Sequence, residues 1–205
     1  MKVLVTGGAG FIGSHLVDRL VQEGHEVVVV DNLSTGKRRN LNRAARFCKL
    51  DIQSWRLERV FRNERPNIVM HLAAQMDVRK SVDDPIFDAQ VNVLGMLNVL
   101  QQAVRHGVRK VVFSSSGGAI YGEQEIYPAP ESHVMRPLSP YGISKLCGEQ
   151  YLSYYQRISG LQMVNLRYAN VYGPRQDPDG EAGVVAIFIQ KLLNNEQAIV
   201  HGNGR

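Results

Sequence analysis

Residues 3–13 read Val-Leu-Val-Thr-Gly-Gly-Ala-Gly-Phe-Ile-Gly, and they set the architecture of the whole chain. They satisfy G-x-x-G-x-x-G at Gly7, Gly10 and Gly13, and G-x-G-x-x-G with Gly8 in place of Gly7. The glycines follow a β-branched run and precede a helical pattern, which is the setting that a dinucleotide-binding turn requires. Glycine is needed because a pyrophosphate must approach the backbone, where a helix N-terminus offers N–H donors and positive potential. We therefore predict a dinucleotide site at this turn.

Short apolar runs alternate with helical patterns through the first 170 residues. The predicted strands, rich in β-branched and apolar residues, are 2–5, 27–30, 46–50, 68–72, 110–115 and 163–167. The predicted helices, which share a period near 3.6, are 11–23, 54–63, 88–106 and 141–159. This alternation predicts an α/β fold, a doubly wound parallel sheet with helices on both faces. Residues 1–170 are thus predicted to form a dinucleotide-binding Rossmann domain.

The pattern changes after residue 170. Residues 170–183 are rich in Gly, Pro and Asp, which is typical of a functional loop. A helix is predicted over 184–194 and a short strand over 198–200. We assign 171–205 to a substrate loop and the start of a smaller C-terminal domain, and we interpret the turn-like ending at Arg205 as a C-terminal truncation.

Composition excludes several classes of protein. The 205 residues carry 24 Lys+Arg and 19 Asp+Glu, a net charge of +5 that is spread along the chain, so we expect no nucleic acid partner. No apolar run approaches the roughly 18 residues of a membrane span. Cys48 and Cys147 lie far apart, and no histidines fall at ligand spacing, so neither a disulfide scaffold nor a metal site is expected. We predict a cytoplasmic protein.

Asp31 ends the second predicted strand, eighteen residues after Gly13. A dinucleotide fold places there the carboxylate that accepts hydrogen bonds from the adenosine ribose diol. It would repel a 2′-phosphate, so we predict NAD rather than NADP, although Lys37–Arg39 weaken the preference slightly. Asp51 and Ile52, just past the third strand, could contact the adenine, or Asp51 could instead cap the following helix.

Ser139-Pro140-Tyr141-Gly142-Ile143-Ser144-Lys145 is the second informative stretch. Ser139 is a favourable N-cap and Pro140 suits the first helical position. Tyr141 and Lys145 then lie four residues apart on one helix face. A cation beside a phenol favours the phenolate, so Tyr141 could act as a general base near neutral pH.

Together these motifs resemble the extended short-chain dehydrogenase/reductase family, the NAD-dependent epimerase and dehydratase group. Besides the glycine turn and the Tyr141/Lys145 pair, the matching segments are Leu72–Gln75, Asn92–Gly95, Ser114–Ser116 with Ala119–Gly122, and Arg167–Arg175. The resemblance covers essentially the whole chain.

The resemblance implies a set of site residues. Tyr141, Lys145 and Ser116 are the predicted catalytic residues, with Ser115 as the alternative hydroxyl because Gly117-Gly118 lengthens this loop by one residue relative to the common family form. The predicted substrate contacts are Ser116, Tyr141 and Asn170. The predicted NAD-binding residues are Gly7, Gly10, Phe11, Ile12, Gly13, Asp31, Asn32, Asp51, Ile52, Leu72, Ala73, Ala74, Gln75, Asn92, Ser114, Tyr141, Lys145 and Tyr168.

The implied reaction is epimerisation of a nucleotide sugar, most closely the interconversion of UDP-glucose and UDP-galactose through a 4-keto sugar. One alternative is another nucleotide-sugar epimerase or a dehydratase, although dehydratases carry Asp-Glu where this chain has Gly117-Gly118. The other is an NAD-binding module with little activity, because the family's UDP contacts come largely from residues beyond 205. A homodimer through helices 88–106 and 141–159 is also implied.

Overall fold

The computed structural model describes residues 1–178 and 183–200. The chain divides into two compact units, Met1–Ala169 and Asn170–Arg205. The second unit contains the helix α8 (Val184–Leu193) within its described residues. The turn-like ending at residues 202–205 lies outside the described residues, as do residues 179–182. The predicted role of 171–205 in substrate binding stays a prediction.

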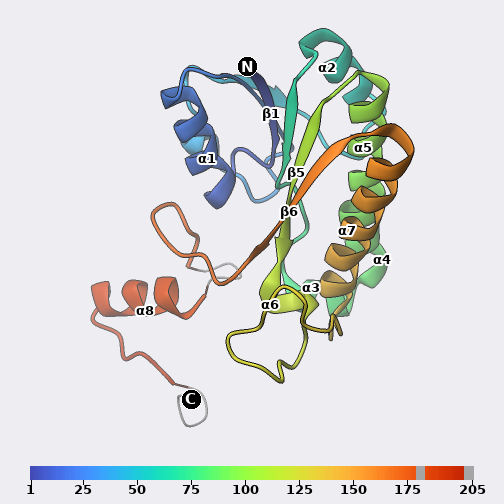
Figure 1. Ribbon diagram of the computed structural model, residues 1–205. Coiled ribbons are helices and arrows are strands. Elements are labelled where there is room, and N and C mark those ends of the chain that lie inside the picture. The colour runs from blue at the N-terminus through green and yellow to red at the C-terminus, as the bar shows by residue number, and fades with distance from the viewer. Residues whose placement is uncertain (179–182, 201–205) are drawn as a thin grey trace. The chain divides into compact units, whose positions relative to one another are not determined.

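The first unit is built on a six-stranded sheet in the order β3-β2-β1-β4-β5-β6, in which every neighbouring pair is parallel (Figure 1). The strands are β1 (Lys2–Thr6), β2 (Glu26–Asp31), β3 (Arg46–Lys49), β4 (Ile68–His71), β5 (Lys110–Ser116) and β6 (Gln162–Tyr168). This order belongs to the doubly wound fold, with the strand order reversing between β1 and β4. The predicted fold class is confirmed.

Helices cover both faces of this sheet (Figure 1). The helix α1 (Phe11–Gln22) packs on one face, and α2 (Leu57–Glu64), α5 (Gly95–Arg105) and α7 (Pro140–Ser159) pack on the other. The shorter elements are the 3₁₀ turn η1 (Arg38–Asn40), α3 (Val78–Asp83), α4 (Pro85–Ala89), the π-helical turn η2 (Gln90–Leu94) and α6 (Gly117–Ile120). In the described residues, no helix is both long and apolar enough to cross a membrane.

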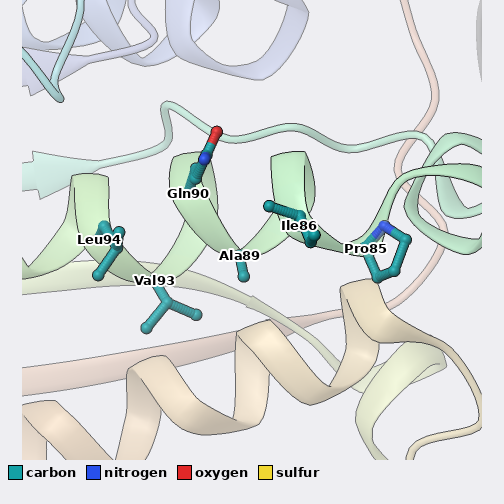
Figure 2. Close-up of a pocket in the computed structure, with 6 residues that line it drawn as sticks. All are labelled: Pro85, Ile86, Ala89, Gln90, Val93 and Leu94. Atoms are coloured by element: carbon teal, nitrogen blue, oxygen red, sulfur yellow. The ribbon is translucent and has the colours of Figure 1, made fainter.

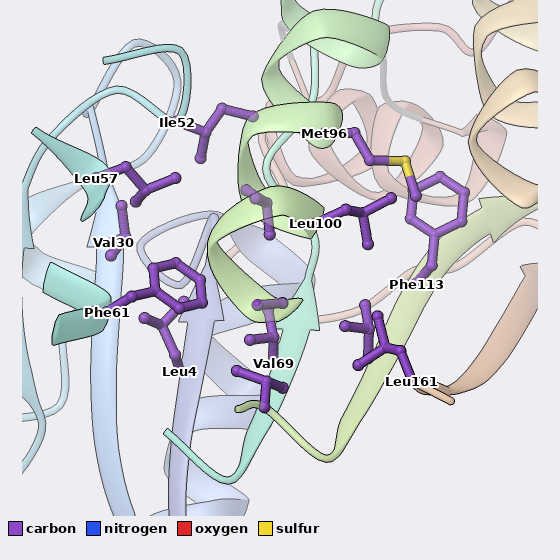
Figure 3. Close-up of a cluster of buried hydrophobic side chains, with 14 of the residues drawn as sticks. Leu4, Val30, Ile52, Leu57, Phe61, Val69, Met96, Leu100, Phe113 and Leu161 are labelled. Carbon is purple, nitrogen blue, oxygen red and sulfur yellow. The ribbon is translucent and has the colours of Figure 1, made fainter. Parts of the chain in front are cut away.

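Two hydrophobic cores follow from the alternation of side chains along the strands. In β1, Val3 and Val5 point to the α1 side, while Leu4 joins Phe61 of α2 and Leu100 of α5 on the other side (Figure 3). Leu4, Phe61 and Leu100 are fully buried. Burying each such side chain contributes about 1.5–3 kcal/mol to the stability of the fold. The packed sheet therefore holds the carboxyl ends of its strands, and the loops that follow them, in fixed positions.

The structure corrects some predicted boundaries. The predicted helix 88–106 is α4, η2 and α5 in succession, because a π turn inserts an extra residue that leaves the apolar periodicity almost unchanged. The helix predicted at 54–63 begins only at Leu57, and α3 was not predicted. The strand predicted over 198–200 is wrong, since a strand needs a neighbour to pair with and these residues are irregular.

Candidate cofactor and catalytic site

The predicted site residues of the first unit gather at one edge of the sheet. Most of them follow the carboxyl ends of the parallel strands, where the loops after β1 and β4 leave toward opposite faces. Lys145, on α7, reaches the same end through its hydrogen bond to the Ser114 carbonyl. Ligands of open α/β sheets bind at such a point, because diverging loops open a crevice there.

The glycine turn is fitted so closely that side chains are excluded. Gly7 has a φ of 73°, and a Cβ there would lie 2.7 Å from the backbone nitrogen of Ala73. A Cβ on Gly13 would lie 2.2 Å from the carbonyl oxygen of Gly7. Gly10 is the N-cap of α1 and provides no side-chain acceptor for the first-turn N–H groups. Those donors, beside the helix dipole, form a cradle that fits a pyrophosphate.

Asp31 is held beside this turn. Its Oδ2 accepts the N–H of Ala9 at 2.9 Å and its Oδ1 accepts the N–H of Leu33 at 2.8 Å. The side chain is buried, and Gly36 approaches so closely that a Cβ there would lie 2.8 Å from Oδ1. A carboxylate has about four acceptor positions, so Asp31 retains acceptor capacity for a ribose diol.

The segments that follow β2 and β3 are joined by a side-chain hydrogen bond. Asn32 Nδ2 donates to Asp51 Oδ2 at 2.7 Å, and Asp51 Oδ1 accepts the N–H of Gln53 at 2.8 Å. Asp51 therefore shapes the turn that precedes α2, but the alternative prediction that it caps this helix is wrong, because the N-cap position of α2 is Arg56 and no side chain of the described residues caps it. The Ile52 side chain packs in the core, and its carbonyl accepts from Asn98 Nδ2 at 2.6 Å. A cofactor contact by Asn32, Asp51 or Ile52 stays a prediction.

The segment after β4 is tied to the end of β1. Thr6 Oγ1 accepts the N–H groups of Leu72 and Ala73, each at 3.2 Å, so its own hydrogen points to His71 Nδ1 at 2.7 Å. His71 is therefore neutral, with its proton on Nε2. Complete burial, and secondarily the positive charge of Lys145, lowers the pKa of His71 to about 3.

Gln75 and Asn92 bind each other rather than pointing freely outward. Asn92 Oδ1 accepts the N–H of Gln75 at 2.8 Å, while its Nδ2 donates to the Gln75 carbonyl and to Asp88, each at 2.9 Å. The oxygen and the nitrogen of the Asn92 side-chain amide are thus both used in hydrogen bonds within the protein. In the structure Asn92 shapes the segment that contains Ala74, and a direct cofactor contact by its side chain stays a prediction.

The three serines at the end of β5 have different surroundings. The carbonyl of Ser114 accepts from Lys145 Nζ at 2.9 Å. Ser115 is buried and donates to Glu149 Oε1 at 2.5 Å. Ser116 is the N-cap of α6, and its side chain is on the opposite face of the strand from Ser115. Because the Ser115 hydroxyl already donates to Glu149, it is less suited than Ser116 to bind a substrate, and the role of Ser116 stays a prediction.

Tyr141 and Lys145 lie on the first turns of α7. Ser139 Oγ accepts the N–H of Gly142 at 3.1 Å, which confirms the predicted N-cap. Lys145 Nζ lies 5.6 Å from the centroid of the Tyr141 ring, and only 4% of Lys145 is exposed. Burial lowers the pKa of Lys145 to about 8, although the charge of Asp88 acts in the opposite direction.

The carboxyl end of β6 lies beside that of β5 at the same end of the sheet. Tyr168 pairs in register with Ser116. Next to it, Arg167 forms an ion pair with buried Glu149, with Nη2 2.7 Å from Oε2. Asn170, the predicted substrate contact, belongs to the second unit, and its role stays a prediction.

Three groups were not found from the sequence. They are the Thr6–His71 hydrogen bond, the Glu149–Arg167 pair and the buried Asp88. A signal existed for Glu149, an acidic residue four positions after Lys145 on the same helix face, but not for Asp88, which is the buried residue of the short helix α4. Their partners come from other elements, which helical periodicity alone does not identify.

The chain is similar to known sugar-nucleotide enzymes. UDP-glucose 4-epimerase of Mycolicibacterium smegmatis is 48% identical, over 100% of this chain and 67% of that protein. The structure of UDP-glucose 4-epimerase with UDP-glucose from Thermotoga maritima gives a TM-score of 0.97 at 52% identity, over 100% of this chain and 67% of that one. The Thermus thermophilus UDP-glucose 4-epimerase complex with NAD gives 0.93 at 54% identity, over 97% and 64%.

This chain spans about two thirds of the length of the curated relatives that it matches. The family match itself extends over residues 3–205, from the glycine turn through the Tyr141/Lys145 helix and beyond. The chain therefore belongs to the NAD dependent epimerase/dehydratase family.

Proposed function

We propose that this chain carries the NAD site and the acid/base residues of a nucleotide-sugar 4-epimerase, with UDP-glucose and UDP-galactose as the substrate pair. The observation that carries the proposal is the placement of Tyr141 and Lys145 on one helix, with Lys145 bonded to the end of β5, at the same sheet edge as the glycine turn and Asp31. The similar proteins named above are UDP-glucose 4-epimerases, which supports this choice of substrates.

NAD fits the residues present. Gly7 and Gly13 allow the close backbone packing that shapes the turn before α1, whose first-turn N–H groups fit a pyrophosphate. Asp31 offers spare acceptors to the ribose diol. A 2′-phosphate would meet the Asp31 carboxylate and be repelled, so NADP should bind less tightly. When bound, NAD would accept a hydride from the sugar and later return it.

The protein groups supply the rest of the chemistry. Tyr141 as phenolate takes the proton of the sugar 4-hydroxyl as C4 is oxidised to a ketone, and it gives the proton back as C4 is reduced on its opposite face. Lys145 holds the nicotinamide ribose and, as a cation, favours the phenolate of Tyr141. Ser116 hydrogen-bonds the sugar oxygen. The redox changes cancel, so the cofactor is regenerated within each turnover.

A dehydratase is the nearest alternative reaction. It needs a further acid/base pair beside the central hydroxyl, but Ser116 is followed by Gly117 and Gly118 at the start of α6. A module that binds NAD without turnover is the second alternative, and other nucleotide sugars are alternative substrates.

We also propose that the protein is a cytoplasmic homodimer. The stretch from α4 into η2 presents an apolar groove of about 490 Å³, lined by Pro85, Ile86, Ala89, Gln90, Val93 and Leu94 (Figure 2). Ile86 is 71% exposed, and the neighbouring α7 exposes Ile143, Tyr154 and Ile158. A second copy of this face would cover these side chains. The free thiols Cys48 and Cys147 agree with a reducing compartment.

Two measurements test the function. Calorimetric titration should show NAD binding more tightly than NADP, and Asp31→Ala should narrow that difference. Incubation with NAD and UDP-galactose should yield UDP-glucose on anion-exchange chromatography. A 4-keto-6-deoxy sugar product would instead identify a dehydratase, and NAD binding without any turnover would identify the module.

A further inference from the structure

Asp88 is a buried anion outside the set of predicted site residues. It has no exposed surface, although it lies on the short helix α4 near the molecular surface. Its Oδ2 accepts from Ser144 Oγ at 2.6 Å, and its Oδ1 accepts from Asn92 Nδ2 at 2.9 Å and Gln75 Nε2 at 3.1 Å. A carboxylate is costly to bury unless its oxygens are satisfied, so three donors from three segments imply a strongly determined position.

These donors connect Asp88 to two parts of the proposed site. Asn92 lies in the π turn η2 and holds both backbone groups of Gln75, in the segment that follows β4. Ser144 precedes Lys145 on α7, three residues after Tyr141. One carboxylate therefore joins the segment after β4 to the turn of α7 that bears both predicted acid/base residues. π-Helical turns are frequent at functional sites, and η2 fits that tendency.

Asp88 also acts on Lys145, the neighbour of Ser144 on α7. Its ammonium is buried and bonds to a neutral group, the Ser114 carbonyl, at 2.9 Å. The titratable groups near it are His71 from β4, Asp88 from α4 and Tyr141 from its own helix. Buried Glu149, one turn further along α7, is paired with Arg167 of β6. His71 is neutral, so Asp88 is the negative charge that opposes the desolvation of Lys145.

We propose that Asp88 is a positioning residue of the epimerase reaction: it fixes the Tyr141–Lys145 turn through Ser144, and its carboxylate is the buried counter-charge that keeps Lys145 protonated. This inference rests on the proposed function for its catalytic half only. The effect on Lys145 is a property of the chain itself.

The variant Asp88→Asn tests the charge with little change in shape. Asn can still accept from Asn92 and Gln75, and the Ser144 hydroxyl can turn to accept from the new amide. The matched control is Glu64→Gln, which neutralises another buried carboxylate that pairs with Lys2 and Arg46 at the opposite end of the strands. The first readout is an NMR titration of ¹³C-labelled lysine without cofactor, with Lys145 assigned by its loss in Lys145→Met.

We expect the Lys145 midpoint to fall by about one pH unit or more in Asp88→Asn and to stay unchanged in Glu64→Gln. An unchanged midpoint in folded Asp88→Asn would overturn the counter-charge. Because this readout needs neither NAD nor turnover, it stands apart from any failure of the proposed function.

The second readout is the rate with UDP-galactose. In Asp88→Asn the alkaline limb of the kcat–pH profile should move to lower pH, because Lys145 loses its proton earlier. Ser144→Ala keeps the Asp88 carboxylate but removes the hydrogen bond that joins it to α7. In this variant kcat should fall about tenfold or more, while the titration midpoint of Lys145 stays unchanged. If Asp88→Asn fails to fold, Ser144→Ala decides: an unchanged kcat would overturn the positioning role.

Discussion

The surroundings of Lys145 change its pKa in a way that suits the proposed chemistry. In water an ammonium of this kind keeps its proton to a pH near 10.4. Burial lowers the pKa of Lys145 to about 8, so the residue remains a cation at neutral pH while lying close to the Tyr141 ring. A cation with little hydration interacts more strongly with a developing phenolate than a solvated one. This residue pair is therefore where the proposed proton transfer is most sensitive to substitution.

Tyr141→Phe should remove epimerase activity and leave the fold and NAD binding nearly unchanged. The ring still fills its space, but the hydroxyl that transfers the proton is gone, and such a group typically contributes about 10²–10⁴-fold to the rate. Turnover of UDP-galactose, with calorimetric NAD binding as the control, checks this. Full turnover in Tyr141→Phe would exclude Tyr141 from the mechanism.

His71 makes stability depend on pH. Its folded pKa is about 3, against about 6.5 in an unfolded chain. Between these values the unfolded chain binds a proton that the folded chain does not. The stabilisation is therefore complete above pH 6.5 and is lost as the pH falls toward 3, by at most about 1.4 kcal/mol per pH unit.

The variant His71→Gln can still accept from Thr6 but cannot titrate. Urea unfolding between pH 7 and 4.5 should show a shallower loss of stability in this variant than in the unmodified chain. The same slope in both proteins would mean that His71 is not buried in its neutral form.

At the scale of elements, sequence patterns predict what is local and miss what depends on distant partners. Each strand of the sheet lies within one or two residues of its predicted bounds, because runs such as Val27–Val30 suit strands buried on both faces. The turn η2 was missed, since its Asn92 is hydrogen-bonded to Gln75 of another segment. The short helix α3 was also missed, although its cap, in which Asp77 accepts the N–H of Lys80, is local. The strand predicted over 198–200 is an error of the opposite kind: the residues favour a strand locally, but no neighbouring strand of the described residues pairs with them.

Gly13→Ala tests the turn between β1 and α1. Its Cβ would lie 2.2 Å from the Gly7 carbonyl oxygen, so the turn must open. We expect a loss of roughly 1–3 kcal/mol in stability and NAD affinity at least about tenfold weaker, measured by urea unfolding and calorimetry.

The matched control is Gly118→Ala. A Cβ at Gly118 meets no atom within 4 Å in the described part of the chain, and its stability should stay within about 1 kcal/mol of the unmodified chain. Equal effects of the two substitutions would contradict the close fit of the Gly13 turn.

At the scale of the whole molecule, the sequence identified the candidate site residues but not the network of buried polar side chains around them. The glycine turn, Asp31, Tyr141 and Lys145 are recognisable because their chemistry requires fixed residue types at fixed spacing. Asp88 and Glu149 are not, because their function depends on which buried donors the fold brings to them. Supporting residues of this kind need coordinates before they can be named.

The proposed dimer predicts a mass twice the 22.9 kDa of the chain in sedimentation equilibrium. Ile86→Glu and Leu94→Lys place charges in the apolar groove and should give the monomer mass, because a buried unpaired charge is costly. Trp55→Ser, which changes an exposed apolar side chain near α2, should leave the dimer intact. A monomer mass for the unmodified chain would contradict the dimer.

The most direct test of the central claim follows one hydrogen atom. The chain is incubated with NAD and UDP-galactose that carries deuterium at C4, and the product is analysed by mass spectrometry and NMR. If the site removes and returns a hydride at C4, the product is UDP-glucose that retains deuterium at C4, with no net accumulation of NADH. UDP-glucose that has lost the label, or no UDP-glucose from chain saturated with NAD, would contradict the account.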